Sequence, residues 1–166
     1  MQKSKYKIIF IGAAILLIAA LVTAYFCGSE FLVIKDFNTG EVIAEYEIND
    51  GGEFAVSFIH SVNKSLVKEG YLISGDTIYL ETCLYSAFGA GVATEVVPPQ
   101  KLEFLEDGSM LISGFHTEMK KLLYFVGTAS NPTLYINGEE IDLKALCGAK
   151  RNIEFKVEKQ FTLFKF

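Results

Sequence analysis

The sequence has little cysteine, only two histidines and no excess of basic residues, and each shortage excludes a class of protein. With Cys27, Cys83 and Cys147 as the only thiols, neither a disulfide-stapled scaffold nor a four-cysteine zinc site is expected. Their spacing alone does not show whether Cys83 and Cys147 pair. The net charge is −5, with 15 Lys and Arg against 20 Asp and Glu. No basic stripe is present to neutralise phosphates, so no nucleic-acid partner is expected.

The N-terminal segment holds a long uncharged apolar run. Three lysines, Lys3, Lys5 and Lys7, precede this run, which extends over residues 8–26. About 18 consecutive apolar residues can span a bilayer as a helix. The positive-inside rule then places the N-terminus in the cytoplasm and the rest of the chain outside. The sequence therefore predicts a lysine tail and transmembrane anchor at 1–27, with residues 8–26 in the bilayer, and an extracytoplasmic domain at 28–166.

A cleaved signal peptide is the alternative for the same segment. Val22-Thr23-Ala24 offers small residues at the positions that a signal peptidase reads, so cleavage after Ala24 would release a secreted domain. The apolar run is longer than the roughly 7 to 15 residues of an ordinary signal-peptide core. This length favours an uncleaved anchor and a single-pass protein of the cell membrane.

Residues 28–166 show little helical periodicity and instead repeat a pattern of strands and turns. Short runs rich in β-branched and aromatic residues alternate with turn signals such as Asn137-Gly138. The expected strands are 31–35, 41–48, 53–60, 67–74, 77–84, 101–105, 110–115, 122–126, 133–136, 139–143, 152–157 and 161–164, with one helical turn at 143–147. This spacing predicts an all-β domain, an antiparallel β-sandwich or open barrel of about ten strands, preceded by one transmembrane helix.

Residues of several chemical types gather between positions 58 and 95. A histidine and a serine end one apolar strand, an acid and a tyrosine lie on the strand that returns, and a second acid lies on the next strand. A glycine-rich turn follows, and its glycines permit a positive φ or a close backbone approach. The candidate binding residues are His60, Ser61, Glu69, Tyr71, Glu81, Gly89, Ala90 and Gly91.

Alternation along the strands predicts which of these side chains share a face. The first set is Glu69, Tyr71 and Ile73, and the second set is Tyr79, Glu81 and Cys83. Which set meets the histidine depends on the hairpin register, which alternation alone does not determine.

His60 has three interpretations. In the structural one, His60 and Glu69 form a hydrogen-bonded pair that holds the end of a hairpin. In the binding one, His60, Glu69 and Glu81 form a cluster for a cation or a polar solute, and their imidazole and carboxylates suit zinc or manganese. In the catalytic one, Ser61 is a nucleophile and His60 is its base. Adjacent strand residues point to opposite faces, so this last arrangement is not expected.

The same stretch resembles a bacterial family catalogued as domain of unknown function 1850. The resemblance rests on His60-Ser61-Val62, on the Val67-x-Glu69 that follows, on Glu81 and on the turn at 89–91. It covers roughly residues 30–95. The resemblance implies a small exported, membrane-anchored protein that accompanies solute transporters of the tripartite ATP-independent periplasmic class.

Three functions follow as hypotheses. The first is an extracytoplasmic binding or accessory module that assists such a transporter, with a multi-helix permease or its solute-binding protein as partner. The second is an exported metal-dependent enzyme or metal-binding protein that uses His60, Glu69 and Glu81, with His116 as an optional further residue. The third is a structural envelope protein. No cofactor is predicted, and a divalent metal belongs to the second hypothesis alone.

Overall fold

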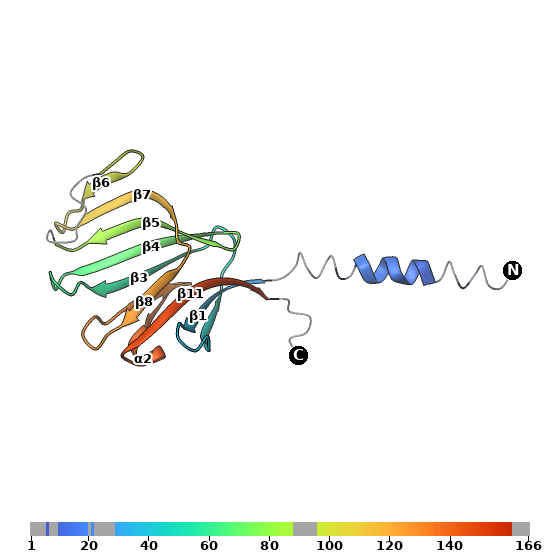
Figure 1. Ribbon diagram of the computed structural model, residues 1–166. Helices are drawn as coiled ribbons and strands as arrows, with labels where there is room; N and C mark the ends of the chain where they lie inside the picture. The colour runs from blue at the N-terminus through green and yellow to red at the C-terminus, as the bar shows by residue number, and fades with distance from the viewer. Residues whose placement is uncertain (1–5, 7–9, 20, 22–28, 88–95, 161–166) are drawn as a thin grey trace.

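The computed structural model describes residue 6, residues 10–19, residue 21 and residues 29–87 and 96–160 (Figure 1). Within these ranges the chain forms strands and one short helix after the N-terminal segment. In chain order they are β1 (Ser29–Asp36), β2 (Val42–Glu47), β3 (Glu53–Ile59), β4 (Leu66–Ser74), β5 (Thr77–Tyr85), β6 (Lys101–Phe104), β7 (Met110–Glu118), β8 (Leu122–Val126), β9 (Thr133–Ile136), β10 (Glu139–Asp142), α2 (Leu143–Cys147) and β11 (Arg151–Gln160).

The strands form two antiparallel sheets of unequal width. The smaller sheet has the order β2-β1-β11-β8, and the larger has the order β10-β9-β3-β4-β5-β7-β6. β1 pairs with β11 over its whole length, from Ser29 opposite Gln160 to Asp36 opposite Ile153. The first and last described strands therefore lie side by side in the smaller sheet (Figure 1). The prediction of an all-β, antiparallel domain is confirmed.

The expected strands agree with the observed ones apart from small shifts of their ends. β9 has the bounds predicted for it, and the helical turn at 143–147 is α2. Asp142 caps this helix, because its carboxylate accepts hydrogen bonds from the backbone amides of Lys144 and Ala145. The final strand is longer than expected, since β11 continues to Gln160. The strand expected at 161–164 lies outside the described residues.

The hydrophobic core lies between the two sheets, the arrangement of a β-sandwich. The smaller sheet contributes Leu32, Ile34, Leu122, Val126, Ile153 and Phe155, and the larger contributes Phe54, Val56, Tyr71, Ile73, Ile78, Leu134 and Ile136. Phe155 is only 2 % exposed. Its ring stacks on that of Phe54 across the interface, with centroids 5.9 Å apart. Burying a large apolar side chain contributes about 1.5–3 kcal/mol, so contacts of this kind hold the sheets together.

A β-bulge in β5 overturns one prediction about its faces. Gly70 pairs with Thr82 but the next residue, Tyr71, pairs with Leu80, so Glu81 has no partner on β4. The extra residue reverses the alternation of side chains along β5. Cys83 and Ile78 are both buried although five positions separate them. The expectation that Cys83 shares a face with Tyr79 and Glu81 is therefore wrong, whereas Tyr79 and Glu81 both contact His116.

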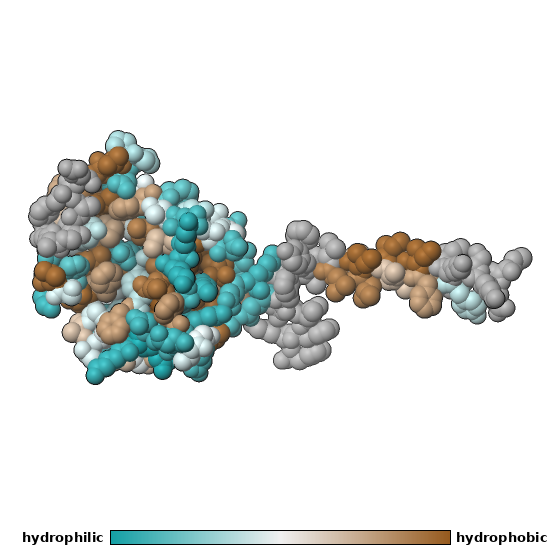
Figure 2. Space-filling model, viewed as in Figure 1, coloured by the Kyte–Doolittle hydropathy of each residue, from teal (hydrophilic) through white to brown (hydrophobic). Residues whose placement is uncertain are grey.

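The N-terminal segment contains a helix at residues 10–19 with exposed apolar side chains. Phe10 is 79 % exposed and Leu16 is 73 % exposed, and Figure 2 shows the helix in the brown and tan of hydrophobic residues. Among the residues that the structure describes, no helix has both the length and the apolar character to cross a membrane. Residues 8, 9, 20 and 22–26 of the expected anchor lie outside the described residues, and Ala24 of the expected cleavage site is one of them. The anchor, the cleavage site and the boundary at residue 28 stay predictions.

Replacing Phe155 by alanine is expected to lower the free energy of unfolding by about 3–5 kcal/mol, because it leaves a cavity between the sheets. Phe104 on β6 is 69 % exposed. Phe104→Ala is therefore a matched control, which we expect to change the free energy by less than about 0.5 kcal/mol. Urea denaturation of the full chain, followed by circular dichroism, measures both variants. Equal losses would contradict this placement of the core.

Candidate functional site

A cavity of about 460 Å³ opens beside β8, the edge strand of the smaller sheet. Its walls come from both sheets and are mostly apolar or aromatic. Leu123 and Phe125 on β8 are exposed and form part of the rim, whereas Tyr71 and Leu122 are buried at its base. The polar residues that line it are Glu69, Tyr71, Lys121, Tyr124 and Ser130. A cavity of this size falls within the range of about 300–1,000 Å³ that is usual for small-molecule sites.

Three polar side chains meet at the base of this cavity, and we call them the carboxylate–tyrosine cluster: Glu69, Tyr71 and Tyr124. The Tyr71 hydroxyl donates to Glu69 Oε2 at 2.9 Å. The Tyr124 hydroxyl donates to the same oxygen, and the two hydroxyl oxygens are 2.7 Å apart. Because Glu69 and Tyr71 lie on β4 and Tyr124 lies on β8, the cluster joins the two sheets.

Aromatic packing places both hydroxyls. The ring of Tyr71 stacks on Phe54 of the neighbouring strand, with centroids 5.0 Å apart. The ring of Tyr124 meets Phe155 edge to face at 5.7 Å and Phe58 of the opposite sheet at 6.0 Å. Edge-to-face and stacked pairs at these distances are favourable. The rings are thereby held with their hydroxyl groups at the carboxylate.

The hydroxyls of the cluster stay protonated. Burial raises the pKa of Tyr71, and the nearby Glu69 charge raises it further. Burial likewise raises the pKa of Tyr124, with added contributions from Tyr71 and Glu69. Cys83 lies on β5 opposite Glu69. Burial raises the pKa of its thiol to about 11. Cys83 and Cys147 are both free and buried, and neither forms a disulfide. Neutral tyrosines act as hydrogen-bond donors to the carboxylate.

His60 and Ser61 lie away from this cluster, in the loop between β3 and β4. The Nδ1 atom of His60 accepts hydrogen bonds from the backbone amides of Val62 and Asn63, at 3.3 and 3.4 Å. Ser61 is exposed. The expected hydrogen bond between His60 and Glu69 is therefore not formed. The His60 imidazole bonds to the backbone of its own loop, and the Glu69 carboxylate bonds to the two tyrosines between the sheets.

Glu81 faces the opposite side of the larger sheet. The bulge turns it toward His116, whose Nδ1 lies 2.6 Å from Glu81 Oε1. The imidazole also stacks on Tyr79, with centroids 4.6 Å apart. His60, Glu69 and Glu81 thus take separate partners. In the described part of the chain, no three His, Cys, Asp or Glu side chains form a group suited to a metal ion.

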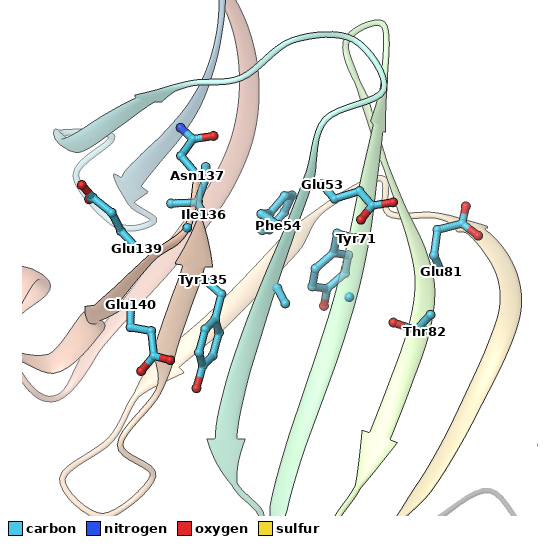
Figure 3. Close-up of a pocket in the computed structure, with 13 residues that line it drawn as sticks. Glu53, Phe54, Tyr71, Glu81, Thr82, Tyr135, Ile136, Asn137, Glu139 and Glu140 are labelled. Atoms are coloured by element: carbon cyan, nitrogen blue, oxygen red, sulfur yellow. The ribbon is translucent and has the colours of Figure 1, made fainter. Parts of the chain in front are cut away.

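Beside Glu81, a trough of about 440 Å³ crosses the outer face of the larger sheet (Figure 3). Small residues form its floor, since Ala55 and Gly70 face each other in register. A Cβ at Gly70 would lie 2.3 Å from the Thr82 hydroxyl, so a side chain there would fill the floor. Around it lie Tyr135 and four acids, Glu53, Glu81, Glu139 and Glu140.

Among the described candidate binding residues, Glu69 and Tyr71 are joined by a hydrogen bond, and Tyr71 and Glu81 both line the trough. Gly89, Ala90 and Gly91 lie outside the described residues, and the part of every candidate in ligand binding stays a prediction. Sequence reasoning missed Tyr124, which is 55 positions from Glu69. The available signal was a tyrosine in the middle of an otherwise apolar strand, where its hydroxyl needs a buried partner.

The comparisons with known proteins identify a family and nothing finer. A family model described as Domain of unknown function (DUF1850) matches residues 54–143, more than half of the 166-residue chain. The match includes β3, β4, β5 and β8, and with them the whole carboxylate–tyrosine cluster. No curated protein and no solved structure matches the chain.

The free energy of unfolding is expected to fall as the pH rises above about 10, the ordinary tyrosine pKa. Tyr71 and Tyr124 keep their protons in the folded state because their pKa is raised, whereas the unfolded chain ionises. The unfolded state then binds fewer protons, so stability declines by about 1.4 kcal/mol per pH unit for each such tyrosine. Below that pH the contribution is fully present.

Tyr124→Phe removes one of the two ionisable hydroxyl groups. Its free energy of unfolding should therefore decline by about 1.4 kcal/mol less per pH unit than that of the wild type. Urea denaturation at a series of alkaline pH values measures the slopes, and tyrosinate absorbance records the ionisation. Identical slopes in the wild type and Tyr124→Phe would contradict the raised pKa of Tyr124.

Proposed function

The chain belongs to the family Domain of unknown function (DUF1850), and from that premise we propose that it is a membrane-anchored binding protein of the cell envelope that assists a solute transporter. The single observation that carries the binding role is the cavity beside β8. It presents a carboxylate and two neutral tyrosines within apolar walls. A few convergent polar groups in a mostly apolar cavity are typical of ligand sites.

The anchor is supported by the N-terminal segment. Three lysines precede an uncharged apolar run, and the helix at residues 10–19 exposes its large apolar side chains. Exposed apolar area of this kind is costly in water and favourable in lipid. With residues 8–26 in the bilayer, Ser29 begins β1 within three residues of the membrane surface. The end of the domain where Ser29 pairs with Gln160 would then face the membrane.

The transporter role is supported by the family resemblance, which implies the tripartite ATP-independent periplasmic class. The partner would be its multi-helix permease or its solute-binding protein. The hairpin turn between β3 and β4 is the surface we assign to this contact. Val62 at this turn is 69 % exposed, so its apolar side chain is accessible to a partner.

The anchor has a direct test. We expect the full chain to remain in the membrane fraction after an alkaline carbonate wash. Leu16→Arg should release much of it, because a charged residue at the centre of a span costs about 2.5–3.5 kcal/mol on the insertion scale. Phe104→Arg, on the exposed surface of β6, is the matched control and should remain bound. A mature N-terminus at Tyr25, found by mass spectrometry, would instead show cleavage after Ala24 and refute the anchor.

The accessory role is tested by affinity purification of the tagged full chain from gently solubilised membranes. We expect a multi-helix permease to co-elute and to remain after washing at high salt. Val62→Asp at the β3–β4 turn should reduce its recovery several-fold, because a charge replaces an apolar contact. Phe104→Asp, equally exposed but on β6, should leave recovery unchanged. Elution of the chain alone from wild-type membranes would refute the proposal.

A further inference from the structure

We propose that the cavity beside β8 binds a small organic ammonium compound, with its positive group at Glu69 and its apolar body against the aromatic walls. The inference rests on the proposed binding role and specifies the chemical class of the ligand. It comes from three properties of the cavity: the charge at its base, the hydrogen-bond donors already in use there, and the aromatic rings around it.

Glu69 is the one acidic side chain among the described residues that line the cavity. Its Oε2 atom accepts hydrogen bonds from both tyrosine hydroxyls. Its Oε1 atom accepts none within the part of the chain that the structure describes, so it remains available to a ligand. A carboxylate with a vacant oxygen, held in place by two neutral donors, is complementary to an ammonium group.

The hydroxyls of the cluster disfavour a negatively charged ligand. Tyr71 and Tyr124 each have one proton, and both protons are used within the cluster, in hydrogen bonds to Glu69 or between the two hydroxyls. Neither is left to donate to an anion, and an anion at the base would be repelled by the carboxylate. Within the described part of the lining, Lys121 is the one cationic side chain. It is exposed, and its Nζ lies 5.4 Å from the ring centroid of Phe37.

The walls suit an organic cation better than a metal ion. Phe58, Tyr71, Tyr124 and Phe125 all line the cavity, and aromatic faces attract ammonium groups through their quadrupoles. A hard divalent cation needs about six or more oxygen ligands, and the carboxylate–tyrosine cluster supplies few. An amine with an apolar body uses the charge and the rings together.

The experiment uses the full chain in lipid nanodiscs, with empty nanodiscs as the blank. Four probes share one aromatic body: 2-phenylethylamine and benzyltrimethylammonium are cations, 2-phenylethanol is neutral, and phenylacetate is an anion. Isothermal titration calorimetry measures each. We expect both cations to bind saturably with one site per chain and at least tenfold more tightly than the alcohol. Phenylacetate should not bind.

Two variants test the assigned residues. Glu69→Gln keeps an acceptor for the tyrosines but removes the charge, and it should weaken binding of the cations at least tenfold while leaving the alcohol unchanged. Phe125→Ala alters the rim, where the side chain is 59 % exposed and the fold is not at risk, and it should weaken the cations about threefold or more. Glu81→Gln, in the trough on the opposite face, is the matched acidic control and should bind as the wild type does.

The inference is overturned if neither cation binds, if the alcohol binds as tightly as the cations, or if Glu69→Gln leaves their affinity unchanged. A loss in Glu81→Gln would also overturn it, by moving the site to the trough. The proposed function is judged separately, by recovery of the permease. A chain that binds no cation yet recovers the permease would refute the ligand class alone, and a chain that binds cations without a permease would refute the transporter role alone.

Discussion

The stacking of Phe54 on Phe155 across the two sheets is the contact on which the cavity depends. Tyr71 stacks on the same Phe54 ring, and Tyr124 meets the same Phe155 ring. These four rings therefore form one continuous aromatic group between the sheets. Their packing brings two hydroxyls from different sheets to one carboxylate. Without it, Glu69 would be a charge between apolar layers without donors, which is costly.

The unequal width of the sheets explains why a cavity lies there. The smaller sheet ends at β8, whereas the larger sheet continues from β4 to β5, β7 and β6 (Figure 1). The inner face of the larger sheet is thus left partly uncovered beside β8. Apolar and aromatic side chains line this opening, and the carboxylate–tyrosine cluster closes its base. The difference in width between the two sheets therefore leaves a concave surface that is open to solvent.

The bulge at Glu81 separates the two acids that the sequence places on neighbouring strands. Simple alternation would let Glu69 and Glu81 approach one another with His60. The extra residue in β5 turns Glu81 to the outer face, where it pairs with His116. No glycine lies at Leu80, Glu81 or Thr82, so the residue type that marks one class of bulge is absent from this stretch. A shift of one residue in the pairing therefore decides which face of the sheet carries the Glu81 carboxylate.

The strand segments and the antiparallel all-β class could be predicted from the sequence, because they depend on local alternation and on turn residues such as Asn137-Gly138. The same alternation puts Glu69 and Tyr71 on one face, since they are two positions apart on one uninterrupted strand. That Tyr124 completes their cluster, and that Glu81 does not belong to it, follows from the folded arrangement. Pairing between distant strands and the register within a sheet arise from packing over the whole core, and no short stretch of residues carries that information.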